Sequence, residues 1–335
     1  MTSKILHLPK NVRGRDFVVG DLHFKIQDLQ RGLQALGFDQ AIDRLIAVGD
    51  VIDRGPGVRE VLQLLDEPWF YSVQGNHEQM LINAYHADPD VRYAAHAMVW
   101  WPMIPYESKS VVIEKLRSLP IAIEIESAQG IVGVVHADVP AGVCWQTFVA
   151  ELENPAIEET ALWGRDRIMK HQRDGVPGAW RVCTGHSWIP RPLRLGNVLA
   201  LDITGGCDGS LAIYCVQDDT IYIDGIPASL DQAERLSDLL AALSEKSQLL
   251  KDSLNSNKLI EAQIFAAEVD TIVKLVSTMW MDAKEGLVEQ QQFINALHGV
   301  SLSKGSRRGA KLDALCSQHT GSQTEGLLRR LINAT

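Results

Sequence analysis

The chain has 335 residues, of which 46% are hydrophobic and 22% charged, a composition typical of globular proteins with one sizeable domain and a smaller one. No run approaches the roughly 18 apolar residues of a membrane span, and the first eleven residues lack the apolar core of a signal peptide, so a cytoplasmic location without membrane contact is expected. The formal net charge of -10 disfavours binding to nucleic-acid backbones, which requires Lys and Arg, so no nucleic-acid partner is expected.

The first 190 residues of the chain contain short apolar runs rich in β-branched residues, each ending at a glycine or a polar residue. Such runs are typical of buried strands that lead into functional loops. The runs cover residues 17–19, 45–48, 70–73, 131–135 and 181–184. Amphipathic helices are predicted between the first three runs, at residues 28–36 and 58–65. This alternation predicts an α/β fold.

Further strands are predicted at residues 198–203, 211–216 and 220–223, with a hairpin turn at Asp218 and Asp219. After Pro227 the strand-like runs stop and helical patterns separated by polar breaks follow. We therefore expect a catalytic domain over residues 1–227 and a helical C-terminal region over residues 228–335. The apolar faces of its helices could pack on the first domain, self-associate or dock a protein partner.

Six polar residues stand at or just after the ends of the predicted strands, where ligands gather in α/β sheets. They are Asp21, His23, Asp50, Asn76, His136 and His186. Each taken alone is an unremarkable strand-end residue, but together three oxygen donors and three imidazoles suit two divalent cations. Such a pair could lower the pKa of a bridging water and so supply a hydroxide nucleophile. We expect Mn²⁺, with Fe, Zn and Mg as alternatives, because a mixed donor set does not select one metal.

Three longer motifs surround these residues. The chain reads Asp21-Leu22-His23, then GDVIDRG over residues 49–55 and GNHE over residues 75–78. In order and separation they resemble the GDxHG, GDxxDRG and GNHE blocks of the PPP family of metal-dependent serine/threonine protein phosphatases, and most of all its phage lambda and bacterial members. His136-Ala137-Asp138, WGRD at 163–166 and TGH at 184–186 extend the resemblance over roughly residues 17–216.

The resemblance implies a calcineurin-like metallophosphoesterase fold, a central β-sandwich flanked by helices, here with an all-helical C-terminal extension. It implies that Asp21, His23 and Asp50 hold one metal ion, and that the second is held by Asp50, Asn76, His136 and His186. It also implies an Asp53–His77 pair with His77 as the general acid, since expulsion of an alkoxide needs a proton donor. Arg54, Asn76 and Arg165 would bind the phosphoryl oxygens. Either arginine could instead form a surface ion pair.

The function implied is that of a phosphomonoesterase acting on phosphoserine or phosphothreonine in phosphoproteins or phosphopeptides. One alternative is a dinucleoside tetraphosphate hydrolase of the same superfamily. Asp53 and Glu78 favour the phosphatase, because the bacterial symmetric-cleaving hydrolases usually lack that aspartate and carry aspartate in place of that glutamate. Another alternative is a catalytically weakened scaffold that acts through its C-terminal helices.

The chain departs from the family pattern at two positions. Phe24 replaces the glycine that ends the first motif, and we expect it to begin the following helix in ordinary backbone geometry and to shield the metal site. Asp202-Ile203-Thr204-Gly205 stands where relatives usually show D-T-G, which leaves the role of Asp202 open. Substrate preference is expected to depend on rim loops such as residues 94–110, with Trp100 and Trp101.

Overall fold

A computed structural model describes residues 3–87, 100–189, 191–204 and 210–228, together with residues 246, 248–250, 252 and 269. The chain divides into two compact units, Met1–Ile168 with Gln172–Leu230 and Asp231–Thr335 with Met169–His171. The helices expected beyond residue 228 lie almost wholly outside the described residues, so the role of this region stays a prediction. Within the described part of the chain, no helix is long and apolar enough to cross a membrane.

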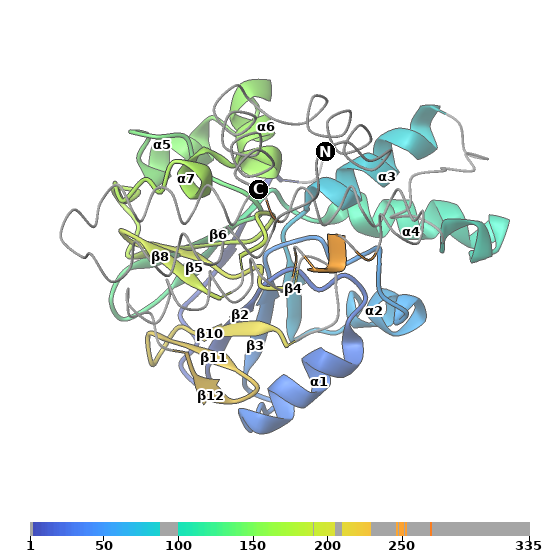
Figure 1. Ribbon diagram of the computed structural model, residues 1–335, viewed down its shortest axis with the longest axis horizontal. Helices are drawn as coiled ribbons and strands as arrows, with labels where there is room; N and C mark the ends of the chain where they lie inside the picture. Colours follow the sequence, from blue (N-terminus) through green and yellow to red (C-terminus); the bar gives the residue numbers. More distant parts are fainter. Residues whose placement is uncertain are drawn as a thin grey trace. The chain divides into compact units, whose positions relative to one another are not determined.

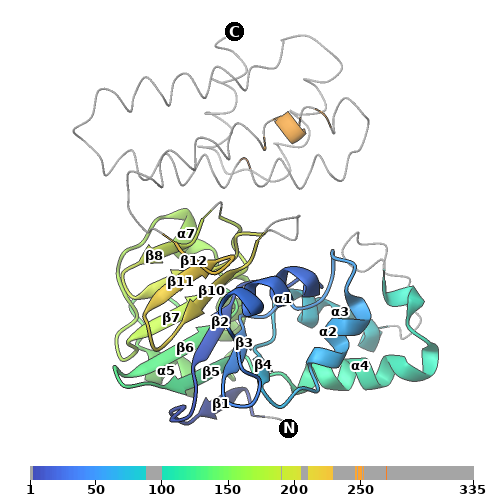
Figure 2. The same ribbon diagram turned by 90° about the horizontal axis from the view of Figure 1, so that it is seen from below.

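The first unit is built on two six-stranded mixed sheets (Figures 1 and 2). The first sheet, in spatial order, consists of β1 (Ile5–Leu8), β5 (Ala122–Glu126), β6 (Ile131–Val135), β7 (Arg181–Thr184), β9 (Val198–Ala200) and β8 (Leu193–Leu195). The second consists of β12 (Ile226–Pro227), β11 (Thr220–Ile223), β10 (Ala212–Cys215), β2 (Asp16–Val19), β3 (Arg44–Ala47) and β4 (Phe70–Ser72). Strands β2, β3 and β4 run parallel, so their carboxyl ends meet at one edge.

The two sheets pack face to face, with helices on both outer faces (Figure 1). The outer face of the second sheet is covered by α1 (Ile26–Ala35), α2 (Val58–Leu64), α3 (Asn76–Ala87) and α4 (Tyr106–Ser118), with the 3-10 turn η2 (Trp101–Met103) before α4. On the first sheet lie α5 (Trp145–Ala150) and α6 (Pro155–Trp163), and the short α7 (Asp166–Met169) follows. The predicted β-sandwich flanked by helices is confirmed.

Strand β2 illustrates why the sequence forms these layers. Phe17 and Val19 pack into the core beneath the helices, whereas Val18, between them, packs into the core between the sheets. Side chains alternate across a strand, so a strand that is buried on both faces reads as a continuous apolar run. The same reasoning explains why the apolar runs that end at Asp50, Asn76, His136 and His186 were recognisable as strands.

The predicted strands at residues 131–135, 181–184 and 220–223 coincide with β6, β7 and β11. The remaining predicted strands and both helices agree with observed elements to within three residues at either end, and β10 and β11 form the expected antiparallel hairpin. Strands β1, β5, β8 and β12 and the helices between residues 76 and 169 were not predicted from the sequence. Three of these four strands, β1, β8 and β12, are sheet edges, where a short segment carries little hydrophobic signal.

Candidate active site

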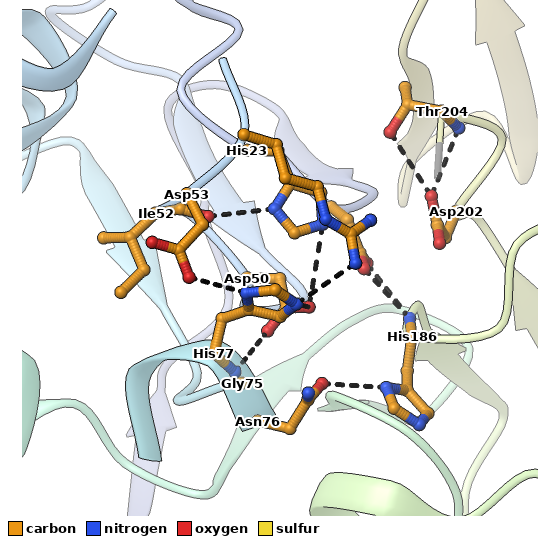
Figure 3. A network of polar contacts seen from close by, with 12 residues as sticks. His23, Asp50, Ile52, Asp53, Gly75, Asn76, His77, His186, Asp202 and Thr204 are labelled. Atoms are coloured by element: carbon orange, nitrogen blue, oxygen red, sulfur yellow. Dashed lines mark hydrogen bonds and ion pairs between the residues drawn. The ribbon is translucent and has the colours of Figure 1, made fainter. Parts of the chain in front are cut away.

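All six predicted metal ligands lie together at the strand ends, and each is at least 93% buried. The loops that carry them are joined by backbone hydrogen bonds. The amides of Leu22 and His23 both donate to the Asp50 carbonyl oxygen, at 3.1 and 2.8 Å, and the His186 amide donates to the Asp21 carboxylate at 3.1 Å. Figure 3 shows the side chains of His23 and Asp50, from two loops, and of His77, from the first turn of α3, converging on one point. The fold thus assembles residues that are up to 165 positions apart.

Two groups of residues in the described part of the chain could hold metal ions. The first contains His23, Asp50 and His77, and the second contains Asp50, His136 and His186; in each group the ligand atoms lie within 4.8 Å of one another. Asp50 belongs to both groups, which fits a carboxylate shared by two ions. The amide oxygen of Asn76 lies 2.8 Å from a ring nitrogen of both His136 and His186, so it also faces the second group.

The hydrogen bonds of the histidines suit metal ligation. His23 and His136 donate through Nδ1 to the carbonyl oxygens of Ile52 and Val48, both at 2.9 Å, which leaves their Nε2 lone pairs facing the site. Nε2 of His136 then faces the Asn76 Oδ1 acceptor. Nε2 of His186 is buried and has no hydrogen-bond partner among the described residues. Asn76 Oδ1 thus faces ring nitrogens of both His136 and His186, and a cation between these atoms would satisfy them.

The electrostatics of the site also favour metal binding. Burial lowers the pKa of His23, His136 and His186 below the ordinary value, which favours the neutral ring that a metal requires. Burial, and then the negative charges of Asp202 and Asp50, raise the pKa of Asp21 well above its ordinary value. Buried carboxylates this close repel one another, and a divalent cation between them would relieve that repulsion.

His77 forms the predicted pair with Asp53. Nδ1 of His77 lies 2.6 Å from Oδ2 of Asp53, so the imidazole donates a hydrogen bond to the buried carboxylate. Burial would lower the pKa of His77, but the charges of Asp50 and Asp53 outweigh it and raise the pKa above its ordinary value. The other ring nitrogen, Nε2, faces Asp50 Oδ2 at 3.7 Å and Arg54 Nη2 at 3.3 Å. The pair therefore presents one nitrogen to the centre of the site.

The two predicted phosphate-binding arginines border the buried residues. Both Arg54 and Arg165 are exposed side chains. Arg165 interacts electrostatically with Asp202, Asp21 and Asp50, and its Nη1 lies 3.5 Å from the Ser187 hydroxyl oxygen. Among the described residues, Arg165 forms no ion pair with a surface carboxylate.

Glu78, the last residue of the GNHE motif, holds two loops together. Its buried carboxylate accepts hydrogen bonds from the amides of Asp50, Val51, Ile52 and Gly75 at 2.7 to 3.2 Å. Burial, followed by the nearby charge of Asp50, raises its pKa to about 8. A Cβ at Gly75 would lie 2.2 Å from Asp50 Oδ1, so this close approach requires glycine. Glu78 therefore fixes the backbone on which Asp50 is presented.

Six residues of the site adopt left-handed backbone angles that non-glycine residues rarely take. They are His23 (φ 43°), Phe24 (φ 59°), Asp50 (φ 47°), Asp53 (φ 75°), Arg54 (φ 67°) and His186 (φ 63°). Such strain persists only where the surrounding structure fixes the backbone, and it concentrates at functional sites. The hydrogen bonds from residues 22–24 to the carbonyl oxygens of Asp50 and Val51 provide that constraint.

The expectation for Phe24 was wrong. Phe24 does not begin the helix in ordinary geometry, since its φ is 59° and α1 starts at Ile26. The amide of Phe24 is bound to the Val51 carbonyl oxygen at 3.0 Å, which imposes the glycine-like conformation on an aromatic residue. Its ring is fully buried in the core beneath the helices and contacts Trp100 edge to face, with ring centroids 5.0 Å apart. Despite the substitution at position 24, Nε2 of His23 lies 3.7 Å from Oδ2 of Asp50.

Phe24→Gly is expected to destabilise the protein while leaving the metal site able to work. Relief of the left-handed strain is worth roughly 1–2 kcal/mol, whereas loss of a buried phenylalanine ring costs about 3–5 kcal/mol. Urea unfolding should therefore show a net loss of about 2 kcal/mol. A gain in stability would contradict this account. A wild-type chain that is inactive on phosphoesters but is rescued by Phe24→Gly would support the scaffold interpretation.

Trp100 and Trp101, which we expected on the rim of the cleft, are instead buried, with 3% and 1% of their surface exposed. The Trp100 indole nitrogen donates a 2.5 Å hydrogen bond to Asp53 Oδ1. No periodic pattern could have paired residues 47 positions apart.

Asp202 is buried and accepts hydrogen bonds from the amide and hydroxyl of Thr204, at 3.1 and 3.3 Å (Figure 3). Asp138, the last residue of the His136-Ala137-Asp138 motif, forms a buried ion pair with Arg167, with Oδ1 and Nε 2.7 Å apart. This pair ties the strand end that carries His136 to the segment that follows Arg165. The sequence analysis assigned no role to Arg167 and left that of Asp202 open.

A two-sheet sandwich that gathers buried aspartates and histidines at its strand ends defines a metallophosphoesterase, a hydrolase of phosphoesters. The model of the calcineurin-like phosphoesterase family matches residues 17–192, and the chain belongs to that family.

Similar proteins include two kinds of phosphoesterase. Serine/threonine-protein phosphatase 2 of Escherichia coli (strain K12) is 33% identical over 207 residues, 60% of this chain and 92% of that protein. Serine/threonine-protein phosphatase 1 of Salmonella typhimurium (strain LT2) is 31% identical over 205 residues, 60% and 91% of the two chains. The symmetrical bis(5'-nucleosyl)-tetraphosphatase of Coxiella burnetii (strain Dugway 5J108-111) is 34% identical over 184 residues, 52% of this chain and 58% of that protein.

Proposed function

We propose that the protein is a serine/threonine protein phosphatase, a phosphomonoesterase that uses two divalent metal ions. Asp21, His23 and Asp50 would hold one ion, and Asp50, Asn76, His136 and His186 the other. Mn²⁺ is the favoured ion. Such ions neutralise phosphoryl charge and activate water at neutral pH. The shared position of Asp50 and the Asn76 oxygen that faces both His136 and His186 support this assignment.

The observation that carries the choice of substrate is the Asp53–His77 pair. A serine or threonine alkoxide is a poor leaving group and needs a proton as the phosphorus–oxygen bond breaks. With Nδ1 bound to Asp53, the His77 ring is oriented so that a proton on Nε2 points into the site, where it can be donated to the leaving oxygen. Asp53 stabilises the imidazolium before transfer and fixes the ring orientation.

Arg54 and Arg165 would bind the phosphoryl oxygens together with Asn76, because guanidinium groups offer paired donors and stay charged. Their placement at the border of the buried site allows them to reach a substrate while the carboxylates remain enclosed. Catalysis then consists of orienting the phosphoryl group, neutralising its charge and protonating the leaving oxygen.

Hydrolysis of dinucleoside tetraphosphates is the second candidate, because symmetrical tetraphosphatases also resemble this chain. Its leaving group is itself a phosphate, which is a stable anion near neutral pH since its second pKa is about 6. Such a reaction has less need of a proton donor, so the buried Asp53–His77 pair favours the alkyl monoester.

The two candidates are separated by a direct comparison of substrates. With Mn²⁺ added to the full chain, phosphate release from a phosphoserine peptide and hydrolysis of diadenosine tetraphosphate are measured at equal concentration. We expect kcat/KM to be at least about tenfold higher for the phosphopeptide, a difference of 1.4 kcal/mol in transition-state stabilisation. A preference for the dinucleotide would replace this proposal with the second candidate, and inactivity on both would reject both.

A further inference from the structure

The carboxylate of Asp53 is bound on both of its oxygens. Oδ2 accepts from His77 Nδ1 at 2.6 Å, and Oδ1 accepts from the indole nitrogen of Trp100 at 2.5 Å. Asp53 is fully buried and Trp100 is 97% buried, so water cannot replace the indole in this contact. A carboxylate with one donor at each oxygen cannot rotate without losing a hydrogen bond, and in a buried site that loss is expensive.

The orientation of Asp53 determines the orientation of His77. Because the His77 ring is held through Nδ1, turning the carboxylate would swing Nε2 away from its position 3.7 Å from Asp50 Oδ2. Asp53 itself has a left-handed backbone, with φ at 75°, a conformation that persists only with support from the surrounding structure. Trp100 supplies that support from just before η2, a different part of the chain.

Trp100 is in turn held by an aromatic cluster. Its indole contacts the Phe24 ring edge to face at 5.0 Å and an interplanar angle of 87°, and contacts Trp101 at 5.5 Å and 84°. Trp101 packs on Tyr85 of α3, the helix whose first turn carries His77, with centroids 6.2 Å apart. Edge-to-face pairs are the favoured geometry of buried aromatic rings. The indole therefore has a fixed direction.

We propose that Trp100 is a positioning residue for the Asp53–His77 pair and that Phe24 supports it. This inference rests on the proposed function, because it assigns Trp100 to the delivery of a proton by His77. Loss of the indole N–H should therefore slow the hydrolysis of substrates with poor leaving groups more than the hydrolysis of substrates with good ones. The proposal also assigns a role to Phe24, support of the Trp100 indole, that a glycine at this position could not fill.

The test compares Trp100→Phe, which keeps a buried ring and removes the donor, with Trp145→Phe. Trp145 is also a buried indole that donates to a carboxylate, Glu124 Oε1 at 2.7 Å, but it lies in the core on the first sheet, outside the aromatic cluster. Both variants of the full chain are assayed with Mn²⁺ on a phosphoserine peptide and on p-nitrophenyl phosphate, whose leaving group is a stable anion. We expect Trp100→Phe to lower kcat for the peptide by about 10- to 100-fold, as loss of an orienting hydrogen bond commonly does. On p-nitrophenyl phosphate kcat should change by less than about threefold. Trp145→Phe should leave the ratio of the two rates unchanged.

An equal fall on both substrates, or no fall on either, would overturn the proposal. Asp53→Asn separates it from the proposed function. If Asp53→Asn changes the ratio of rates and Trp100→Phe does not, only the role of Trp100 is wrong; if neither changes it, the proton-donor role of His77 also fails. Should Trp100→Phe not fold, Phe24→Leu gives the second test. Because Phe24→Leu removes the ring that holds the Trp100 indole, it should also lower the rate on the peptide relative to the rate on p-nitrophenyl phosphate. An unchanged ratio of these rates would contradict the inference.

Discussion

Replacing His77 by asparagine is expected to lower kcat for a phosphoserine peptide by about 10²- to 10⁴-fold, the usual contribution of a positioned general acid. The same change should lower kcat for p-nitrophenyl phosphate far less, because p-nitrophenolate leaves without a proton. A larger fall in kcat for the substrate with the poorer leaving group indicates that proton donation has been lost. General damage to the site would lower kcat for both substrates alike. Steady-state kinetics on the two substrates provide the measurement.

His86→Asn is the matched control for this prediction, since His86 lies on the same helix, α3, and is exposed. It should leave both rates unchanged. Metal content must be measured in parallel, because His77 also lies in one of the two groups that could hold an ion. If His77→Asn loses metal and both activities fall together, His77 is a ligand and the assignment as proton donor is wrong.

Asp50→Asn is expected to remove activity on both substrates by at least about 10³-fold, since transition-state stabilisation by a charged site is worth at least that much. Asp50 is shared by both groups of candidate ligands, so its charge is needed by each ion. The amide also lacks the negative charge that two cations at this position would share. Burial alone would raise the pKa of Asp50, but the surrounding imidazole rings, led by His136, lower it.

The loss of activity in Asp50→Asn should coincide with loss of bound Mn²⁺. The metal content of protein recovered from gel filtration is measured by elemental mass spectrometry. Asp66→Asn is the control, because Asp66 is an exposed carboxylate paired with Lys115, and exposed ion pairs contribute little. It should keep both metal and activity. Full activity or unchanged metal content in Asp50→Asn would exclude the shared-carboxylate arrangement.

The strand ends could be predicted from sequence because strands buried on both faces leave a continuous apolar signal. Val18 and Phe17 face different cores, yet both are apolar, and the polar residue that follows marks the end of the strand. The six predicted ligands were found in this way and through their motifs, and the structure brings them together. Their individual roles stay predictions.

What the sequence could not predict depends on contacts between distant residues. The left-handed geometry of Phe24 follows from a hydrogen bond to Val51, and no local propensity favours it in a phenylalanine. Trp100 contacts Asp53 across 47 residues, and two adjacent tryptophans outside any predicted strand or helix resemble rim residues as much as core residues. Both departures from expectation lie at the site itself, where tertiary constraints override local preference.

The central claim, a site for two ions that share Asp50, is tested most directly by anomalous diffraction from a crystal of the full chain loaded with Mn²⁺. The account predicts two anomalous peaks within coordination distance of Asp50, one also bound by Asp21 and His23 and the other by Asn76, His136 and His186. A single peak, or peaks away from Asp50, would contradict it.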